Sequence, residues 1–315
     1  MKVFVAGASG AIGVPLITEL IGSGHEVTGM TRSQDQAIKL SKLGAKVAIV
    51  DAFDAKAVAD AIKIAQPEVV IDELTSLPKD PADYGSAFEG DRKLRLEGGT
   101  ILHQAAMTAG VRRYIQQSSG YFLQTSGGLA DEAADLTLDA SPGIAGAARV
   151  YFEVEERLAR SGNIEGVALR YGIFYGPNTW YSPDGAAADH ARRQELPIIG
   201  EGDGVWSFIH IHDAATATVA AMTSPAGVYN IVDDDPSSVR DWLPAFARSV
   251  GAPPPPQFSV EEATKVAGED AVYYGTKLRG ASNAKARKIL NFIPRRLEWF
   301  SEISPQSQEQ ASSLR

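Results

Sequence analysis

Glycines mark the part of the sequence with the clearest chemical meaning. The run GASGAIG covers residues 7–13 and directly follows an apolar stretch. A backbone without Cβ atoms lets a phosphate approach closely, and a helix that begins after the run offers it free N–H groups. An ordinary tight turn is the alternative. The expected strand before the run and helix after it favour the binding of a dinucleotide pyrophosphate.

The choice of cofactor depends on the residues at the end of the next expected strand. A carboxylate there would bind both ribose hydroxyls of NAD and repel a 2′-phosphate. This chain has Arg32 instead, between Thr31 and Ser33. A guanidinium forms charge-assisted hydrogen bonds with a phosphate, and the two hydroxyls can complete the site. We therefore expect NADP(H) rather than NAD(H), with a solvated surface arginine as the alternative reading of Arg32.

The elements that must position these residues alternate along the first 170 residues. Apolar runs of strand length predict strands at 2–6, 26–30, 46–50, 68–73, 112–117 and 166–170. Helical patterns between them predict helices at 14–22, 34–43, 54–65, 91–109 and 146–160. Repeated βαβ units of this kind predict an α/β fold with a Rossmann-type, doubly wound parallel sheet.

The pattern changes after residue 170 and predicts a smaller C-terminal α/β substrate lobe. A strand at 208–211 leads into a helix that begins at Asp213. A strand at 228–232 precedes a helix at 237–250, and prolines 253–256 form an extended link to a last helical segment. We expect a dinucleotide-binding domain of residues 1–178, to which 205–232 return, a substrate-binding lobe of 179–204 and 233–303, and a disordered tail at 304–315.

Composition excludes several classes of function. The chain has 30 Lys and Arg against 39 Asp and Glu, a net charge of −9, so nucleic acid is not an expected partner. No apolar stretch is long enough to span a membrane. The absence of cysteine excludes disulfides, thiolate metal sites and Cys nucleophiles.

His210 and His212 would share one face of a strand, but no third ligand cluster is nearby, so we expect no metal. We expect a cytoplasmic protein with a small-molecule substrate, and a homodimer is the oligomer to consider.

Several segments together resemble a known family. They are GASGAIG at 7–13, Asp51, Ser118 and Ser119, RYGIFYGP at 170–177, FIHIHD at 208–213 and VYNIVDD at 228–234. With them, nearly the whole chain resembles the extended branch of the short-chain dehydrogenase/reductase superfamily, the NAD-dependent epimerases and dehydratases. This resemblance also implies a Rossmann fold, a nicotinamide dinucleotide cofactor, and Asp213 as the cap of the helix that follows 208–211.

The resemblance implies a cofactor site residue by residue. The residues that would hold the pyrophosphate are Gly7, Ser9, Gly10, Ala11, Ile12 and Gly13. Asp51 and Ala52 would contact the adenine, although Asp51 could also serve as a turn residue, with Asp54 the better helix cap. The residues that would contact the nicotinamide end are Leu74, Thr75, Ser118, Tyr171, Gly172 and Ile173.

The family's catalytic motif, Tyr-x-x-x-Lys, is absent. Ser119 matches the family's serine, but Ala148 and Phe152 take the places of the tyrosine and the lysine, and no lysine occurs from 146 to 160. The chain is therefore identified as an atypical member. Two tyrosines could replace the missing one: Tyr151, one helical turn later, and Tyr121, two residues after Ser119. Packing is the alternative role of both.

The missing lysine also predicts a direction of reaction. A phenol without a neighbouring cation keeps a pKa near 10, so at neutral pH it donates a proton but hardly accepts one. We therefore expect an NADP(H)-dependent oxidoreductase that reduces a carbonyl or a conjugated enone. Aromatic residues in 171–181 and Trp206 suggest an apolar or ring-bearing substrate, unless they form ordinary core. The alternatives are a catalytically silent dinucleotide-binding sensor or regulator and a nucleotide-sugar epimerase or dehydratase.

Overall fold

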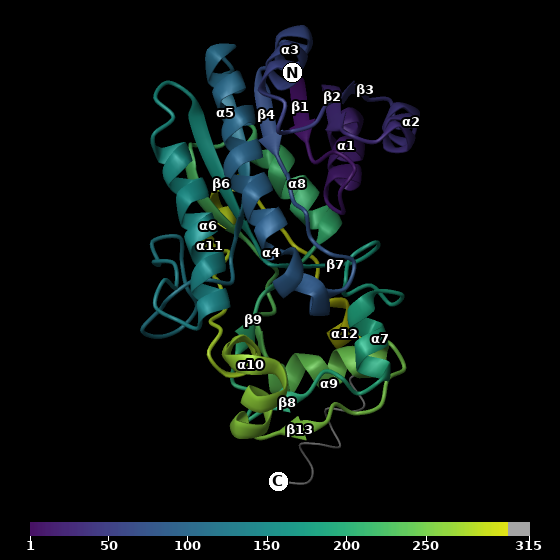
Figure 1. Ribbon diagram of the computed structural model, residues 1–315, viewed down its shortest axis with the longest axis vertical. Helices are drawn as coiled ribbons and strands as arrows, with labels where there is room; N and C mark the ends of the chain where they lie inside the picture. Colours follow the sequence, from purple (N-terminus) through teal and green to yellow (C-terminus); the bar gives the residue numbers. More distant parts are fainter. Residues whose placement is uncertain (302–315) are drawn as a thin grey trace.

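A seven-stranded parallel sheet forms the centre of the molecule in a computed structural model, which describes residues 1–301 (Figure 1). In sheet order, the strands are β11 (Gly227–Ile231), β6 (Glu165–Tyr171), β5 (Arg113–Ser119), β4 (Val69–Asp72), β1 (Lys2–Ala6), β2 (Glu26–Thr31) and β3 (Lys46–Ile49). The predicted α/β fold with a Rossmann-type doubly wound sheet is confirmed.

The order of the strands reverses between β1 and β4. From β1 the chain winds outward through β2 and β3, and from β4 it winds the other way through β5 and β6 to β11. Val3 of β1 accordingly pairs with Val27 on one side and Val69 on the other. Open parallel sheets bind ligands at such a switch point, beyond the carboxyl ends of the strands.

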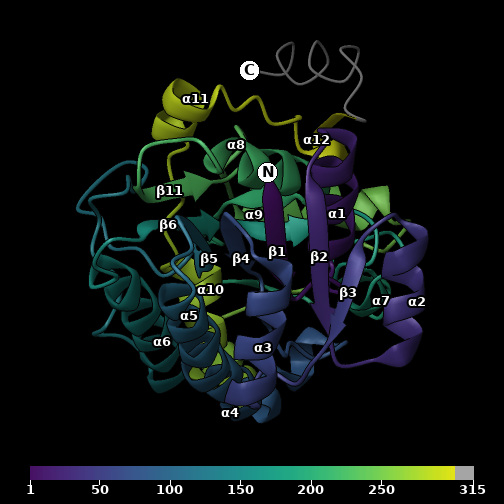
Figure 2. The same cartoon turned by 90° about the horizontal axis from the view of Figure 1, so that it is seen from above.

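Helices cover both faces of the sheet (Figure 2). On one face lie α1 (Gly13–Gly22), α2 (Gln34–Lys42), α8 (Ile211–Ala221) and α11 (Ala284–Leu290). On the other lie α3 (Ala55–Ala65), α5 (Gly99–Thr108) and α6 (Pro142–Ala159). Leu16 of α1 and Leu102 of α5 are fully buried against opposite faces. The central strands are therefore covered on both sides, which explains their continuous apolar runs.

The helix predicted at 91–109 begins earlier and is not uniform. It consists of α4 (Tyr84–Lys93), a π-helical turn η2 (Leu94–Gly98) and α5, preceded by the short 3₁₀ turn η1 (Pro81–Asp83). Tyr84 and Phe88, four residues apart, pack edge to face with ring centroids 6.1 Å apart. This contact supports the additional N-terminal turns, which the apolar pattern did not reveal.

The expected capping role of Asp213 is wrong. Helix α8 begins at Ile211, and its N-cap is His210, whose ring Nδ1 accepts the His212 N–H at 3.2 Å. Asp213 instead pairs with Arg295 at 3.0 Å. Nδ1 of His210 is thus used in the cap, and residues 1–301 contain no cluster of three His, Cys, Asp or Glu that could hold a metal ion.

The remaining elements gather beyond the carboxyl ends of the sheet strands (Figure 1). Three two-stranded pairings occur there: β7 (Ile173–Tyr175) with β10 (Phe208–His210), β9 (Val205–Trp206) with β12 (Ser237–Ser238), and β8 (Ile198–Ile199) with β13 (Gln257–Phe258). The helices are α7 (Ala186–Arg192), α9 (Val239–Ser249), α10 (Val260–Thr276) and α12 (Glu298–Ser301). The tail predicted at 304–315 lies outside the described residues. None of the described helices is long and apolar enough to cross a membrane.

A carboxyl group is buried at the end of β4. Glu73 is 3% exposed, and its Oε1 accepts the Tyr171 hydroxyl at 2.9 Å. Its other oxygen is buried without a hydrogen-bond partner among the described residues. Burial raises the pKa of Glu73 to about 8, although the hydrogen bond from Tyr171 opposes that shift.

This carboxyl group should make stability depend on pH. Between pH 4.5 and about 8 the folded state holds a proton that the unfolded state has lost, so the free energy of unfolding falls as pH rises through that window. Glu73→Gln, which keeps the shape but cannot ionise, should flatten this slope. Urea unfolding of both proteins across the window measures it. Parallel slopes would contradict a buried, protonated Glu73.

Candidate functional site

Two glycines of the loop at residues 7–13 are required by the backbone packing of the protein itself. Gly7 has φ +77°, and a Cβ placed there would lie 2.3 Å from the Glu73 carbonyl oxygen. A Cβ on Gly13 would lie 2.4 Å from the Gly7 carbonyl oxygen. The loop therefore packs tightly against the end of β4, at the switch point of the sheet.

Gly10 has a different environment. It is exposed, and the nearest protein atom to a Cβ placed there would be the Gly7 carbonyl oxygen, at 3.2 Å. Helix α1 begins beside it without a side-chain cap. The loop thus leaves the N-terminus of α1 open beside a backbone position without a Cβ atom. This arrangement fits a dinucleotide phosphate. Ser9 and Ala11 are partly buried around it, whereas the Ile12 side chain packs into the core and leaves only its backbone to face a ligand.

The end of β2 carries an exposed cation. Arg32 makes no hydrogen bond or ion pair with any other described residue. The Thr31 hydroxyl accepts the Ser33 N–H at 3.2 Å, and the Ser33 hydroxyl caps α2 by accepting the Gln36 N–H at 3.4 Å. Each hydroxyl keeps its own proton and can still donate to a phosphate.

The expected adenine side of the site begins after β3. Asp51 is exposed and accepts the Phe53 N–H at 2.9 Å, whereas Asp54 caps α3 by accepting the Ala57 N–H at 2.9 Å. Asp54 is therefore the cap, as expected. Ala52 is 7% exposed and packs against the start of α5. Contact of Asp51 and Ala52 with adenine stays a prediction.

Some residues expected at the nicotinamide end have structural side chains. The Tyr171 ring is 2% exposed in the core, and its hydroxyl contacts Glu73 and Thr218, so only its backbone is free for a cofactor. The Ser118 hydroxyl donates to Glu155 at 2.6 Å and is not free either. Gly172 lies against the backbone before β10, where a Cβ would come 2.7 Å from the Ser207 carbonyl oxygen. The Ile173 side chain is buried.

Three other expected residues lie where strands β4 and β5 end. Leu74 and Thr75 follow β4 and are partly buried. Ser119 ends β5; it is 2% exposed, and its hydroxyl accepts the Tyr121 N–H at 3.4 Å. Strands β4 and β5 are neighbours in the sheet, so these residues leave it side by side. The contact of Leu74 and Thr75 with the nicotinamide and the catalytic role of Ser119 stay predictions.

The structure places a cation beside Tyr151, which the sequence analysis did not expect. Tyr151 is 8% exposed on α6 and stacks on Phe122, with ring centroids 5.8 Å apart. The Cζ atom of Arg95 lies 5.0 Å from the centre of the Tyr151 ring. Burial raises the pKa of Tyr151, and Arg95 acts in the opposite direction. Burial also raises the pKa of Tyr121, so both phenols remain protonated at neutral pH.

Helical spacing could have revealed Arg95. It is buried together with Asp91, Gly98 and Leu102, at intervals of three and four residues. Two charged residues on this otherwise small or apolar stripe are unusual, because burying a charge costs free energy unless it is paired. These two charges at buried positions are the feature of the sequence from which Arg95 could have been predicted as a functional residue. The prediction of an ordinary helix at 91–109 did not take them into account.

The aromatic residues divide into two groups. Tyr171 and Phe174 pack in the sheet core and Tyr175 is fully buried, so these three are structural. Other rings, on the segment after β5 and on the C-terminal elements, are only partly buried: Tyr121, Trp180, Tyr181, Trp206 and Tyr274, which we call the aromatic cluster. Trp206 links them, with its ring centroid 6.4 Å from that of Tyr181 and 5.9 Å from that of Tyr274.

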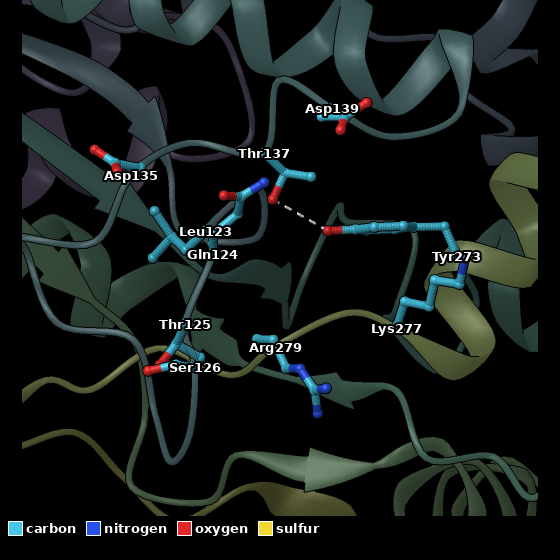
Figure 3. Close-up of a pocket in the computed structure, with 10 residues that line it drawn as sticks. All are labelled: Leu123, Gln124, Thr125, Ser126, Asp135, Thr137, Asp139, Tyr273, Lys277 and Arg279. Atoms are coloured by element: carbon cyan, nitrogen blue, oxygen red, sulfur yellow. Dashed lines mark hydrogen bonds between the residues drawn. The ribbon is translucent and has the colours of Figure 1, made fainter.

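A separate open pocket of about 440 Å³ lies between the 123–139 segment and the end of α10 (Figure 3). The Tyr273 hydroxyl donates to the Thr137 hydroxyl across it at 3.2 Å, and Lys277, next to Tyr273, and Arg279 also line the pocket. It contains none of the residues expected to bind cofactor or to react. The predicted site and this pocket are therefore different places.

Comparison with known proteins identifies the family. Residues 3–232 match the NAD dependent epimerase/dehydratase family. The chain belongs to this family. It is thus an enzyme of the dehydrogenase or reductase type that uses a nicotinamide dinucleotide, as the sequence predicted, and the catalytically silent alternative is not supported.

Individual relatives and solved structures agree with this assignment. A 3-diazoavenalumate denitrifying reductase from Streptomyces sp is 39% identical over 302 residues, 95% of this chain and 98% of that protein. UDP-glucose 4-epimerase from Mycolicibacterium smegmatis is 28% identical, over 82% of this chain and 85% of that protein. The structure of UDP-glucose 4-epimerase from Thermus thermophilus with NAD has a TM-score of 0.70 at 22% identity, covering 96% of this chain and 100% of that one. At that identity the likeness shows the fold alone.

The exposed Arg32 gives a prediction about cofactor choice. Arg32→Ala should weaken NADPH binding by about 1.5–3 kcal/mol, the range for hydrogen bonds to charged groups, and leave NADH binding little changed. Calorimetric titration with both cofactors measures the difference. Lys39→Ala removes another exposed charge on neighbouring α2 and should spare both affinities. Equal losses for the two cofactors on removal of Arg32 would contradict a 2′-phosphate contact.

The open space at Gly10 gives a second prediction. Gly10→Val should abolish binding of either cofactor, because its side chain would fill the space that the pyrophosphate needs. Gly22→Ala is the control, since a Cβ at Gly22, the last residue of the following helix α1, has no neighbour within 4 Å. Circular dichroism should show that both variants are folded. A folded Gly10→Val protein with normal affinity would remove this loop from the cofactor site.

Proposed function

We propose that this chain is an NADPH-dependent reductase of small aromatic compounds. The open glycine turn and the exposed Arg32 support the choice of NADPH, which when bound supplies a hydride from its nicotinamide ring. The protein must then hold the acceptor and, where the chemistry requires it, supply a proton. The candidates for the two tasks are Ser119 and Tyr121 at the end of β5, Tyr151 on α6, and the aromatic cluster. Ligands of open parallel sheets bind beyond the carboxyl ends of the strands.

The position of Tyr121 and Trp206 is the observation that carries the proposal. Both are partly buried, and both pack on two separate hydrophobic clusters, one containing Tyr151 and one built from the C-terminal elements. They therefore link the hydrophobic cluster around Tyr151, a candidate proton donor, to the rings of the C-terminal elements. Aromatic rings attract one another beyond the area they bury, so this environment favours a ring-bearing substrate.

Proton supply favours reduction. Burial raises the pKa values of Tyr151 and Tyr121, so each can donate a proton at neutral pH. When a carbonyl or a conjugated carbon is reduced, negative charge develops on the substrate oxygen, and a phenol together with the Ser119 hydroxyl can stabilise it. The reverse reaction needs a phenolate, which burial disfavours. We expect rapid oxidation of an alcohol only in alkali.

The name of one relative points to a second kind of hydride acceptor, which should be tested together with the carbonyl compounds. The Streptomyces protein that is 39% identical is named a denitrifying reductase of a diazo compound. An arenediazonium cation that gains one hydride at its ring carbon loses N₂, and its charge balances without proton transfer. Such chemistry needs no Tyr-x-x-x-Lys motif. The absence of that motif from this chain favours this acceptor.

Turnover assays decide between the acceptors. NADPH consumption should be observed with aromatic aldehydes, aryl enones or arenediazonium salts, against reactions without protein. With a carbonyl acceptor, Tyr151→Phe should lower kcat at pH 7 by about 10²–10⁴-fold, the usual contribution of general acid catalysis, and Tyr121→Phe is the comparison variant. With a diazonium acceptor, both variants should keep their rate while ¹⁵N-labelled substrate releases labelled N₂.

Different outcomes contradict different parts of the proposal. Tight NADPH binding without turnover of any of these acceptors would contradict a reductase of aromatic compounds. Full carbonyl reduction by both Phe variants would contradict their role as proton donors. Fast alcohol oxidation at pH 7 would contradict the expected direction.

A further inference from the structure

A buried ion pair lies beside Tyr151, and the proposed function does not use it. Asp91 and Arg95 are each 3% exposed, and Nε of Arg95 donates to the Asp91 carboxylate at 2.7 Å. The second Asp91 oxygen accepts the Ser76 N–H at 2.6 Å. Burying such a pair costs desolvation free energy that apolar residues of the same size would avoid. Stability of the fold therefore does not account for this ion pair.

The geometry directs the positive charge at the phenol ring. The Cζ atom of Arg95 lies 5.0 Å from the centroid of the Tyr151 ring, within the range of a cation–π contact. Its Nη1 is buried and has no hydrogen-bond partner among the described residues. Asp91 accepts the hydrogen bond from Nε. The guanidinium is thus fixed at Nε, while its Nη1 donor has no partner among the described residues.

The backbone at this point is irregular. Arg95 belongs to the π-helical turn of residues 94–98, between two regular α-helical segments. Single π-turns inside α-helices change the direction of side chains and are frequent at functional sites. Arg157 of α6 secures the same turn by donating to the Arg95 carbonyl at 3.2 Å. The turn is therefore fixed against the helix that carries Tyr151.

Other ionisable groups around Tyr151 do not supply positive charge. They are the phenols of Tyr84 on α4, Tyr121 after β5 and Tyr274 on α10, and the carboxylate of Asp91. Asp91 acts in the same direction as burial, against ionisation of the phenol. In the described part of the chain, Arg95 is the cation that favours the ionised form of Tyr151.

We propose that Arg95 is the positioning residue of Tyr151 and performs the electrostatic task that the lysine of the Tyr-x-x-x-Lys motif would perform. The inference rests on the proposed function, in which Tyr151 is the proton donor. As the O–H bond of Tyr151 breaks, the proton bonds to the substrate oxygen and the electron pair stays on the phenolate. The guanidinium over the ring stabilises this phenolate, and a proton from solvent restores the phenol.

The test measures the ionisation of the phenol at position 151 directly, in protein without substrate. Difluorotyrosine incorporated at position 151 ionises more readily than tyrosine, and its ¹⁹F chemical shift reports ionisation as pH is raised. Arg95→Gln should raise the pKa of this group by about one unit or more, as expected when a neighbouring opposite charge is lost. Arg95→Lys should restore much of the shift. Arg92→Gln, on the exposed side of the same helix, should cause none.

A second readout links the residue to catalysis. With a carbonyl acceptor, Arg95→Gln should lower kcat at least tenfold and leave the KM for NADPH unchanged, and Arg95→Lys should recover activity. If the Arg95→Gln protein does not fold because it leaves Asp91 buried and unpaired, Asp91→Asn with Arg95→Gln removes both charges and keeps an acceptor for Ser76. The ¹⁹F pKa should shift in the same direction, because Arg95 outweighs Asp91 at the ring.

The results separate this inference from the proposed function. Equal ¹⁹F pKa values in wild type and in the Arg95→Gln or the double variant would overturn the role of Arg95, whichever substrate is reduced. A clear shift in pKa, combined with full carbonyl reduction by Tyr151→Phe, would instead overturn Tyr151 as the donor. A shift with loss of kcat and rescue by lysine would establish both.

Discussion

The contact between the first βα turn and the end of β4 is the constraint on which the site depends. Gly7 touches the Glu73 carbonyl, and Gly13 folds back on Gly7, so a Cβ at either position would meet backbone atoms. This packing brings β1 and β4 together where the winding of the sheet reverses. It sets the open N-terminus of α1 beside the ends of β4 and β5. The predicted dinucleotide site and Ser119 thereby lie at one edge of the sheet.

Electrostatics at that edge follow from which charges are buried and which are exposed. Arg32 is exposed and free to meet a ligand, whereas Arg95 is buried and held by Asp91. An exposed cation contributes to recognition through hydrogen bonds that replace water. A buried cation acts through a low dielectric, in which its effect on a neighbouring phenol is much stronger. In the proposed function and the inference that rests on it, the two arginines thus act in two physically different ways.

The C-terminal elements contribute rings rather than charges to the proposed site. Trp206 lies on β9, a strand of two residues, and its Nε1 donates to the Tyr274 carbonyl at 2.8 Å. Trp180 similarly donates to the Pro78 carbonyl at 2.9 Å, which ties the segment after β4 to the C-terminal part of the chain. Both indoles are therefore oriented by one polar contact each, while their faces stay available for packing. In the proposed function, these faces contact a flat, apolar substrate.

The sequence by itself determined the doubly wound α/β fold, the glycine loop and the absence of the Tyr-x-x-x-Lys motif. These features are local: strand-length apolar runs, a glycine spacing and a missing residue type can all be read within one segment. The tertiary structure alone decided that Arg95 meets Tyr151, 56 positions apart in the numbering, and that the hydroxyls of Tyr171 and Ser118 are already used. It also decided that His210, and not Asp213, caps α8. Such partnerships depend on where a π-turn or a helix end points each side chain, and no periodic pattern encodes that direction.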